Sequence, residues 1–447
     1  MAPNIKLMYY NSRGFGEVIR LLLKYGSIDF EDVRIEYAEW PNIKPKMPFG
    51  QLPVYEEDSK RIGQSNAIAR YIAKKVNLHG NSDWEDLEID AIVDTIEDFK
   101  IKVMAVRYES DPDKRNKLKA TVLNETLPYY LGKFDDIAKQ NNGHLALNKL
   151  TWADILFTTL TDGFFILLGE DMLDTYKNLQ LVRENVLKVP SIQSWVQSSP
   201  KPNMGLKTLL NIVAIVAVAF ISYRWGSSNV SNESKATNDN ENRADIPSKI
   251  TLHYFDARWT TETVRWLLKY GGIEFTDHRV EKSTWGDIKP TMPFGHLPVI
   301  EVDGKKGAQS IAIARYVAKM AKLTGANDWE DLEIDAIVDT LNDIKEKISN
   351  MFGEEDEKAK DILKETHLKE TLPYYFEKFE SMAKNNNGYL VGKKLTWADF
   401  YFTVACELYA GILGSDVVEH YPNLVKVRQN VLKLPALLYR FDIVRVE

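Results

Sequence analysis

Residues 4–36, NIKLMYYNSRGFGEVIRLLLKYGSIDFEDVRIE, decide the fold, because their pattern returns at residues 248–281 as SKITLHYFDARWTTETVRWLLKYGGIEFTDHRVE. Apolar and polar residues alternate at the start of the second stretch, which predicts a strand. Apolar residues spaced i, i+3 and i+4 follow, and this spacing predicts an amphipathic helix. Two units of this chain therefore open in the same way, with a strand followed by a helix.

The repeat covers both halves of the chain at one constant offset. The matching positions include Tyr9 and Tyr254, Trp40 and Trp285, Pro53 and Pro298, Asp98 and Asp343, and Asp154 and Asp399. A period this long indicates gene duplication, because solenoid repeats are only about 20–50 residues long. We therefore expect two complete copies, joined by a segment that neither copy shares.

Within each copy the periodicity changes partway along. The segments PFGQLPVYEE and PFGHLPVIEV read as a turn followed by a strand, and helices open at Ser65 and Ser310. From DWEDLEIDAIVDT onward the pattern is almost entirely helical. We expect mixed α/β domains at 1–81 and 249–326, all-helical domains at 82–203 and 327–447, and a separate central segment at 204–248.

Composition excludes several classes of function. The chain has 447 residues and a formal charge of -7, without a Lys/Arg cluster, which argues against nucleic acid as a partner. One cysteine, Cys406, excludes a disulfide framework and predicts reducing surroundings. The first residues lack a signal-peptide core, so a cytoplasmic protein is expected.

The central segment contains the most apolar run, LLNIVAIVAVAFISY at residues 209–223. Extended to 206–225, the run has the length that a helix needs to cross the ~30 Å hydrocarbon core of a bilayer. We expect a single transmembrane helix here, which would anchor the protein and hold the two copies on opposite sides of the membrane. A hydrophobic linker without a membrane is the alternative.

Several motifs resemble those of the cytosolic glutathione transferases, the sigma class most closely. They are LMYYNSRG and LHYFDARW, W-x2-IKPxMPFGxLPV, GQSNAIARY and AQSIAIARY, DAIVDT, and LTWAD. The resemblance implies a thioredoxin-like βαβαββα domain that binds glutathione, followed by an all-helical domain, in each copy. It also implies two-fold pairing of the copies, either within one chain or between chains.

The resemblance assigns the catalytic role to Tyr9 and Tyr254. In the family this tyrosine donates a hydrogen bond to the glutathione sulfur. A free thiol has a pKa near ~8.5, so a well-placed donor favours the reactive thiolate at neutral pH. The implied activity is addition of that thiolate to hydrophobic electrophiles or reduction of lipid hydroperoxides. Prostaglandin D-type isomerisation and a catalytically weak, crystallin-like structural role are the alternatives.

The glutathione-binding residues also follow from the resemblance. In the first copy they are Arg13, Trp40, Lys44, Gln51, Leu52, Pro53, Gln64, Ser65 and Asp98; in the second they are Arg258, Trp285, Lys289, His296, Leu297, Pro298, Gln309, Ser310 and Asp343. Leu-Pro matches a cis-proline turn, and the helix start at Gln-Ser suits a carboxylate. The two aspartates match a residue that reaches glutathione across a dimer interface.

No metal-ligand spacing occurs among the seven histidines, so no metal site is expected from them. The acidic helix face at Asp94, Glu97 and Asp98 has two alternatives: a solvated surface or a Mg²⁺ site at the interface. Thr151 and Asp154 fit a capping box, as do their counterparts in the second copy.

Some positions depart from the family pattern. Phe15 and Thr260 stand where relatives often carry a basic residue, and Trp259 with Thr260 replaces the glycine-containing turn of the first copy. The second copy keeps Gly392, whereas LALNKLTWAD of the first copy lacks that glycine. We expect these changes to affect the choice of electrophile more than glutathione binding.

Overall fold

The computed structural model describes residues 4–169, 172–200, 249–259, 261–354 and 356–438. In the first copy a four-stranded sheet has the order β2-β1-β3-β4. Strands β1 and β2 are parallel, whereas β3 runs antiparallel to both β1 and β4. The strands are β1 (Ile5–Tyr10), β2 (Glu31–Ile35), β3 (Val54–Glu57) and β4 (Lys60–Gly63).

Helices α1 and α3 cover one face of this sheet and carry its apolar residues into the core. The connection between β2 and β3 is made of short helical turns that lead to the Leu52–Pro53 bond, which is cis. The helices of this domain are α1 (Gly14–Tyr25), α2 (Trp40–Ile43) and α3 (Ser65–Lys75), with 3-10 turns η1 (Lys44–Lys46) and η2 (Pro48–Gly50).

The rest of the first copy is helical. The core helix α7 begins with the expected capping box: Asp154 accepts hydrogen bonds from the backbone of Thr151 at 2.8 Å and of Leu145 at 2.7 Å. The elements are α4 (Asp83–Tyr108), α5 (Pro112–Thr121), the π-turn η3 (Val122–Thr126), α6 (Leu127–Gln140), α7 (Trp152–Leu168), α8 (Lys177–Leu187) and α9 (Pro190–Ser198).

The second copy repeats this architecture, with sheet order β6-β5-β7-β8 and a cis Leu297–Pro298 bond. Its α/β domain contains β5 (Ile250–Phe255), α11 (Thr261–Tyr270), β6 (Thr276–Val280), α12 (Trp285–Ile288), η4 (Lys289–Thr291), η5 (Pro293–Gly295), β7 (Val299–Val302), β8 (Lys305–Ala308) and α13 (Ser310–Met320). Its helical domain contains α14 (Asp328–Ser349), η6 (Asn350–Gly353), α15 (Glu357–Thr366), η7 (His367–Thr371), α16 (Leu372–Asn385), α17 (Trp397–Leu413), α18 (Pro422–Leu432) and α19 (Pro435–Leu438). The expected alternation of α/β and all-α domains, twice over, is therefore present.

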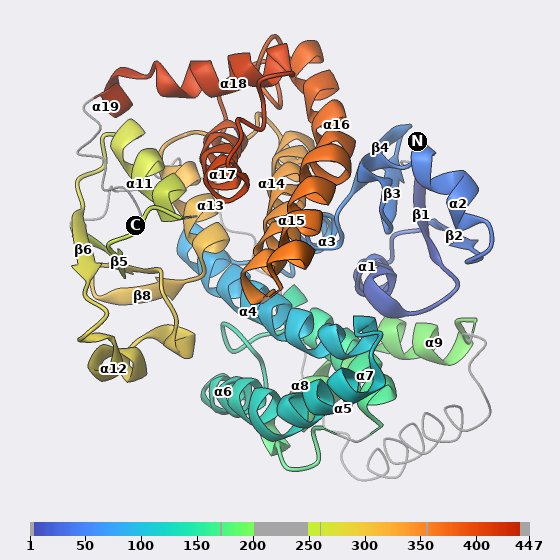
Figure 1. The fold of residues 1–447 in the computed structure, drawn as a ribbon. Helices are drawn as coiled ribbons and strands as arrows, with labels where there is room; N and C mark the ends of the chain where they lie inside the picture. The colour runs from blue at the N-terminus through green and yellow to red at the C-terminus, as the bar shows by residue number, and fades with distance from the viewer. Residues whose placement is uncertain (1–3, 170–171, 201–248, 260, 355, 439–447) are drawn as a thin grey trace, which may run out of the picture.

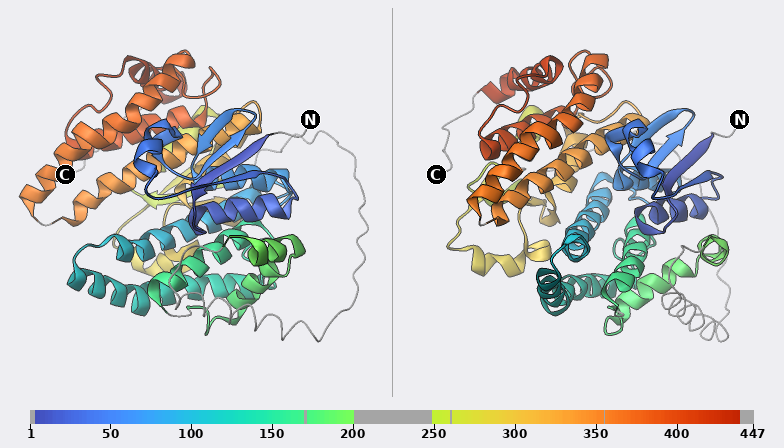
Figure 2. Two further views of the ribbon diagram at one scale, coloured as in Figure 1. Left: turned by 90° about the vertical axis from the view of Figure 1, so that its right-hand side faces the viewer. Right: turned by 45° about the vertical axis from the view of Figure 1, so that its right-hand side comes forward.

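The two copies pack against each other within one chain. Helix α4 of the first copy contacts α13 of the second, and α14 contacts α3 in the same way. Figure 1 shows α4 and α14 at the centre of the molecule, between the two sheets. In the views of Figure 2 the strands of the first copy, in blue, lie beside the orange helices of the second. Each α/β domain thus faces the helical domain of the other copy.

A buried network of charged residues joins the copies at the centre of this interface. Arg70 lies 2.8 Å from Asp90 and 3.2 Å from Asp335, and Arg315 lies 2.8 Å from Asp335 and 2.9 Å from Asp90. Two edge-to-face aromatic pairs, Tyr71 with Trp329 and Trp84 with Tyr316, flank the network. Each arginine therefore contacts an aspartate from both copies, which fixes how the copies dock.

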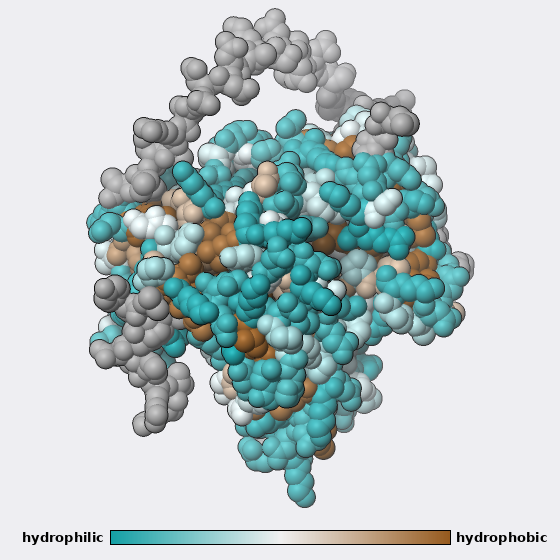
Figure 3. All heavy atoms as spheres, turned by 90° about the horizontal axis from the view of Figure 1, so that it is seen from above, coloured by the Kyte–Doolittle hydropathy of each residue, from teal (hydrophilic) through white to brown (hydrophobic). Residues whose placement is uncertain are grey.

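The prediction of a transmembrane helix between the copies was wrong. In the part of the chain that the structure describes, no helix is long and apolar enough to cross a membrane, and 206–225 lies outside that part. The physical reason is the pairing itself, because a single span would separate two copies that are in contact through buried side chains. Seen from above, the described surface is mostly hydrophilic, with apolar residues in small patches (Figure 3).

Candidate functional site

Tyr9 lies at the end of β1, beside the start of α1. Its ring is 6% exposed, and its hydroxyl accepts a hydrogen bond from the backbone N–H of Phe15 at 3.1 Å. A side chain at Gly14 would lie 2.6 Å from that hydroxyl, and one at Gly16 would lie 2.6 Å from the ring. Gly14 also has a φ of +41°, which other residues rarely adopt. The two glycines therefore allow the helix to begin against the phenol.

The environment of the phenol keeps it protonated. Burial raises the pKa of Tyr9 to about 12, although the N–H of Phe15 lowers it in part. Burial likewise raises the pKa of Tyr254, against the opposing effects of Thr261 and Arg265. The hydrogen bond from Phe15 N–H uses a lone pair of the Tyr9 oxygen. The hydroxyl hydrogen of Tyr9 therefore remains available to an acceptor. Each copy thus presents a neutral O–H donor at the same point of the fold.

Gln64, the residue before α3, contacts residues of both copies. Its backbone has a φ of 77°, which turns the side chain amide toward the other copy. Gln64 Nε2 lies 3.2 Å from Gln51 Oε1 in its own copy, 2.9 Å from Thr340 Oγ1 and 3.0 Å from Asp343 Oδ2. A carboxylate of the second copy therefore lies against the glutamine of the first; the role that the family resemblance assigns to this aspartate stays a prediction.

The second site is built in the same way. Gln309 has a φ of 71°, and its Nε2 lies 2.9 Å from Asp98 Oδ2 and 3.0 Å from Thr95 Oγ1. Burial raises the pKa of Asp98 and that of Asp343, while the contacting glutamine amides lower both. Each copy thus contributes one aspartate to the site of the other.

Ser65 and Ser310 are the first residues of α3 and α13. At a helix start the backbone N–H groups have no partner within the helix and carry the positive end of its dipole. One of these donors, Ala312 N, lies 3.2 Å from Asp94 Oδ2 of the other copy. The helix starts beside Gln64 and Gln309 therefore suit an anionic group.

Four residues that the resemblance assigns to glutathione binding lie on the turns between β2 and β3 and between β6 and β7, called here the rim of each candidate site: Trp40, Lys44, Trp285 and Lys289. Trp40 opens α2 and packs edge-to-face on Tyr10, as Trp285 packs on Phe255. Lys44 lies over the ring of Tyr374, a residue of the other copy.

In the second copy the same rim contains Lys289 and His296. Burial, with Lys289 and other nearby lysines, lowers the pKa of His296. The ring of Tyr129 stacks on His296, and its hydroxyl donates to Phe294 O at 2.6 Å. Both rims therefore include an aromatic residue from the opposite copy.

The structure does not bring Arg13 to the glutamine cluster. Its guanidinium lies 3.9 Å from Asp162 of the helical domain, and Asp162 also pairs with Arg183 at 3.0 Å. Arg258, at the matching position, is half-buried. The departure at Trp259 is visible as a φ of +36° and an indole that lies 6.2 Å from the ring of Phe352. Thr260 lies outside the described residues.

Sequence reasoning missed the threonines at the interface. Thr95 and Thr340 contact the site glutamines of the opposite copy, and both also donate to a carbonyl of their own helix. Thr95 lies three residues before Asp98, and residues three apart share one face of a helix. This spacing could have predicted that Thr95 lies at the interface beside Asp98.

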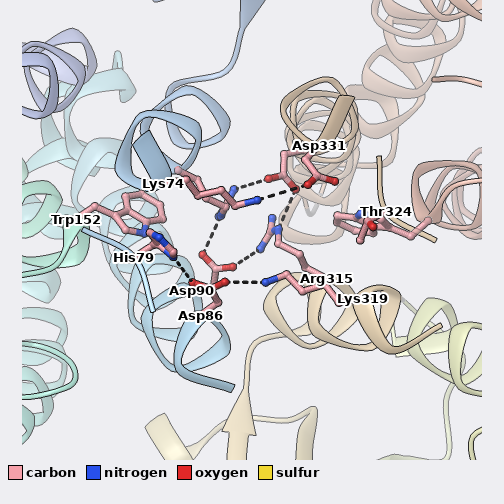
Figure 4. Close-up of a pocket in the computed structure, with 12 residues that line it drawn as sticks. Lys74, His79, Asp86, Asp90, Trp152, Arg315, Lys319, Thr324 and Asp331 are labelled. Atoms are coloured by element: carbon pink, nitrogen blue, oxygen red, sulfur yellow. Dashed lines mark hydrogen bonds and ion pairs between the residues drawn. The ribbon is translucent and has the colours of Figure 1, made fainter. Parts of the chain in front are cut away.

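No group of three or more potential metal ligands occurs among the described residues, so the structure gives no support to a Mg²⁺ site at the interface carboxylates. A cavity of about 480 Å³, including space open to solvent, lies elsewhere, on the interface between the copies. Figure 4 shows it walled by the charged network, with Lys74 directed at Asp331 and Lys319 at Asp86. Neither tyrosine donor lines it.

Comparison with known proteins gives the family. The model described as the N-terminal domain of glutathione S-transferase matches residues 5–74 and 250–319, and the model of the C-terminal domain matches 97–199 and 342–438. A glutathione S-transferase of Anopheles gambiae is 44% identical over 44% of this chain and 98% of that protein. Glutathione S-transferase S1 of Drosophila melanogaster is 43% identical over 43% of this chain and 78% of its own length.

A further relative is the human hematopoietic prostaglandin D synthase, 35% identical over 45% of this chain and 100% of that protein. Each of these relatives corresponds to one copy, because the matches cover less than half of this chain. The chain belongs to the glutathione S-transferase family and carries the two domains of that family twice.

Proposed function

We propose that the chain is a glutathione transferase with two active sites, each made from both copies. The observation that carries this proposal is the pair of crossed contacts, Asp343 on Gln64 and Asp98 on Gln309. The glutamine of each contact lies in the same copy as a protonated tyrosine near the end of that copy's first strand, buried at Tyr9 and half-buried at Tyr254. The family match supports glutathione as the co-substrate of both sites.

In the first site the proposed mechanism uses the hydroxyl of Tyr9. Its hydrogen is directed to the sulfur of glutathione and favours the thiolate over the thiol, while the N–H of Phe15 holds the phenol in place. The thiolate then attacks the electrophile. With an aryl halide a C–S bond forms and the halide leaves as an anion. Tyr254 performs this step in the second site.

The remaining residues hold the tripeptide. The start of α3 with Ser65 binds the γ-glutamyl carboxylate, and Asp343 of the other copy accepts from the γ-glutamyl amine. The backbone of Leu52 pairs with the cysteinyl residue, and Trp40 with Lys44 holds the glycyl carboxylate. The matching residues of the second copy have the same roles. We further propose a sigma-class transferase that works in the cytoplasm.

Replacement of the tyrosines tests the proposal. Tyr9→Phe and Tyr254→Phe should each remove part of the turnover of 1-chloro-2,4-dinitrobenzene, and the double variant should lower it about 10- to 1,000-fold. Glutathione affinity should change little, because most contacts to the tripeptide lie elsewhere. Unchanged turnover in the double variant would contradict the mechanism. Retention on immobilised glutathione without turnover in the unsubstituted chain would favour a structural, crystallin-like protein instead.

A second function is prostaglandin D-type isomerisation, which the similarity to hematopoietic prostaglandin D synthase favours. The same thiolate would attack an endoperoxide oxygen, and glutathione would be released unchanged. Incubation with a prostaglandin endoperoxide and analysis of the products by mass spectrometry tests it. A product mixture equal to that of spontaneous decay would exclude this activity.

A further inference from the structure

A buried arginine lies over the ring of each tyrosine donor. The guanidinium carbon of Arg20 is 5.8 Å from the centroid of the Tyr9 ring, and that of Arg265 is 5.8 Å from the centroid of the Tyr254 ring. A cation within about 6 Å of a ring centroid is attracted by the ring face. Arg20 is 0% exposed and Arg265 is 3% exposed, so water screens neither charge strongly. Both copies therefore place a buried positive charge against the phenol.

Hydrogen bonds hold the arginine of the first copy at this place. Arg20 Nη1 donates to Ser12 O at 2.8 Å, which ties the arginine to the loop between β1 and α1. Arg20 Nε donates to Asp32 of β2 at 2.9 Å, and Glu17 of α1 accepts from Nη1 at 3.1 Å. Because three acceptors on three elements hold it, the guanidinium has little freedom to move away from the ring.

The second copy repeats this arrangement. Arg265 Nη1 donates to Ala257 O at 2.9 Å and to Glu262 at 3.2 Å, and Arg265 Nε donates to Asp277 at 3.2 Å. The turns between tyrosine and arginine differ in sequence, NSRGFG in the first copy and DARWTT in the second. The contact between arginine and phenol is therefore a feature of both copies and does not depend on one particular turn.

One nitrogen of each guanidinium stays without a hydrogen-bond acceptor in the part of the chain that the structure describes. These nitrogens are Arg20 Nη2 and Arg265 Nη2, and both are buried. An arginine that served only to fix the loop would be expected to pair all its donors, because unpaired buried N–H groups are costly. An aromatic face is a weak acceptor for N–H groups. The phenol ring, within cation–π distance, is therefore the partner available to the rest of the guanidinium.

The positive charge opposes the effect of burial on the phenol. Burial raises the pKa of Tyr9, whereas the N–H of Phe15 and the charge of Arg20 lower it. In the second copy burial raises the pKa of Tyr254, whereas Thr261 and Arg265 lower it. A phenol that carries more positive charge beside it donates a stronger hydrogen bond to an anion.

We propose that Arg20 and Arg265 are positioning residues of the two sites: each holds its phenol ring in place and makes the hydroxyl a stronger donor to the sulfur of glutathione. Because both arginines are buried, they act through the tyrosines. The thiol of bound glutathione therefore loses its proton at a lower pH than it would beside the same phenol without this cation. This inference rests on the proposed transferase function.

The pH dependence of turnover tests this role. In a chain carrying Tyr254→Phe, turnover reports mainly the first site. At saturating glutathione, kcat/KM for 1-chloro-2,4-dinitrobenzene rises with pH as the bound thiol ionises, and the midpoint of the rise gives the pKa of that thiol. Arg20→Met should move the midpoint up by about 0.5–1 pH unit, which leaves about 3- to 10-fold less thiolate at a fixed pH below the midpoint. Arg20→Lys keeps the charge and should move the midpoint less.

Two further variants in the same chain separate this effect from a loss of structure. Asp32→Asn removes a negative charge that offsets Arg20, so the midpoint should move down, opposite to its movement in Arg20→Met. A network with a structural role alone would lose activity in both variants at every pH, without a shift of the midpoint. Arg265→Met is the matched control, because it removes the equivalent arginine from the other site. It should leave the midpoint of the first site unchanged.

Two results would overturn the inference: an unchanged midpoint in Arg20→Met, or an equal shift in Arg20→Met and Arg265→Met. If Arg20→Met fails to fold, Asp32→Asn decides alone, because a midpoint that falls supports the role and one that stays or rises contradicts it. Either contradiction would leave the proposed function standing. Absence of turnover by the unsubstituted chain would contradict the proposed function, and the role of the arginines with it.

Discussion

The substitution Asp343→Asn should damage the first active site although Asp343 belongs to the second copy. Asp343 Oδ2 lies 3.0 Å from Gln64 Nε2, and its charge faces the position proposed for the γ-glutamyl amine. A hydrogen bond to a charged group contributes about 1.5–3 kcal/mol, which corresponds to a loss of about 10- to 150-fold in glutathione affinity. Asparagine preserves the size of the side chain, so packing of the interface should change little.

The assay separates the two sites. In a chain with Tyr254→Phe, turnover reports mainly the first site, and Asp343→Asn should raise its KM for glutathione by that factor. In a chain with Tyr9→Phe the same substitution should change KM less than about 2-fold, because Asp98 supplies the second site. Asp98→Asn should raise KM for glutathione at the second site and change it less than about 2-fold at the first. An equal rise of KM in both backgrounds, or a rise only at the second site, would refute the crossed arrangement.

Three further predictions concern stability. Burial raises the pKa of Asp94 to about 7 and that of Asp339 to about 8. The folded state therefore holds more protons than the unfolded state between about pH 4 and pH 8. Because of this difference, the free energy of unfolding falls as pH rises through that window. The double substitution Asp94→Asn with Asp339→Asn should therefore raise the melting temperature more at about pH 9 than at about pH 5. An equal shift at the two pH values would contradict the raised pKa values. Asp399→Ala removes bonds from the backbone of Leu390 and Thr396, both at 2.8 Å, and should cost about 2–4 kcal/mol in urea unfolding; a loss under about 1 kcal/mol would show that the cap is dispensable. Arg315→Met removes one cationic partner from each of the buried Asp90 and Asp335 and should lower the free energy of unfolding by about 3–5 kcal/mol in the same assay. No change in that free energy would show that Arg315 does not stabilise the contact between the copies.

Local sequence features predicted much of the fold and of each site. The strand and helix periods, the glycines beside Tyr9 and the capping box at Thr151 and Asp154 depend on neighbours in the chain, so a sequence pattern can reveal them. The crossing aspartates were found only through the family resemblance, because residues in contact across the interface are far apart in sequence. Gln64 and Asp343, for example, are separated by 279 positions.

Features that depend on packing between the copies could not be read from the sequence. Arg13 pairs with Asp162, a contact fixed by how the helical domain docks on α1. The transmembrane prediction failed for a related reason: the apolar run at 206–225 has sufficient length, but length carries no information about pairing of the flanking copies. The buried contacts of Arg70 with Asp335 and of Arg315 with Asp90 decided that question.

Calorimetric titration of the full chain with glutathione tests the central claim most directly, because it counts complete sites. Each site contains one copy's tyrosine and glutamine with the other copy's aspartate, so the account predicts two glutathione molecules bound per 51.2 kDa chain. It also predicts that Asp343→Asn weakens binding of one of the two and leaves the other intact. A single glutathione per unsubstituted chain, or loss of both molecules on this one substitution, would contradict it.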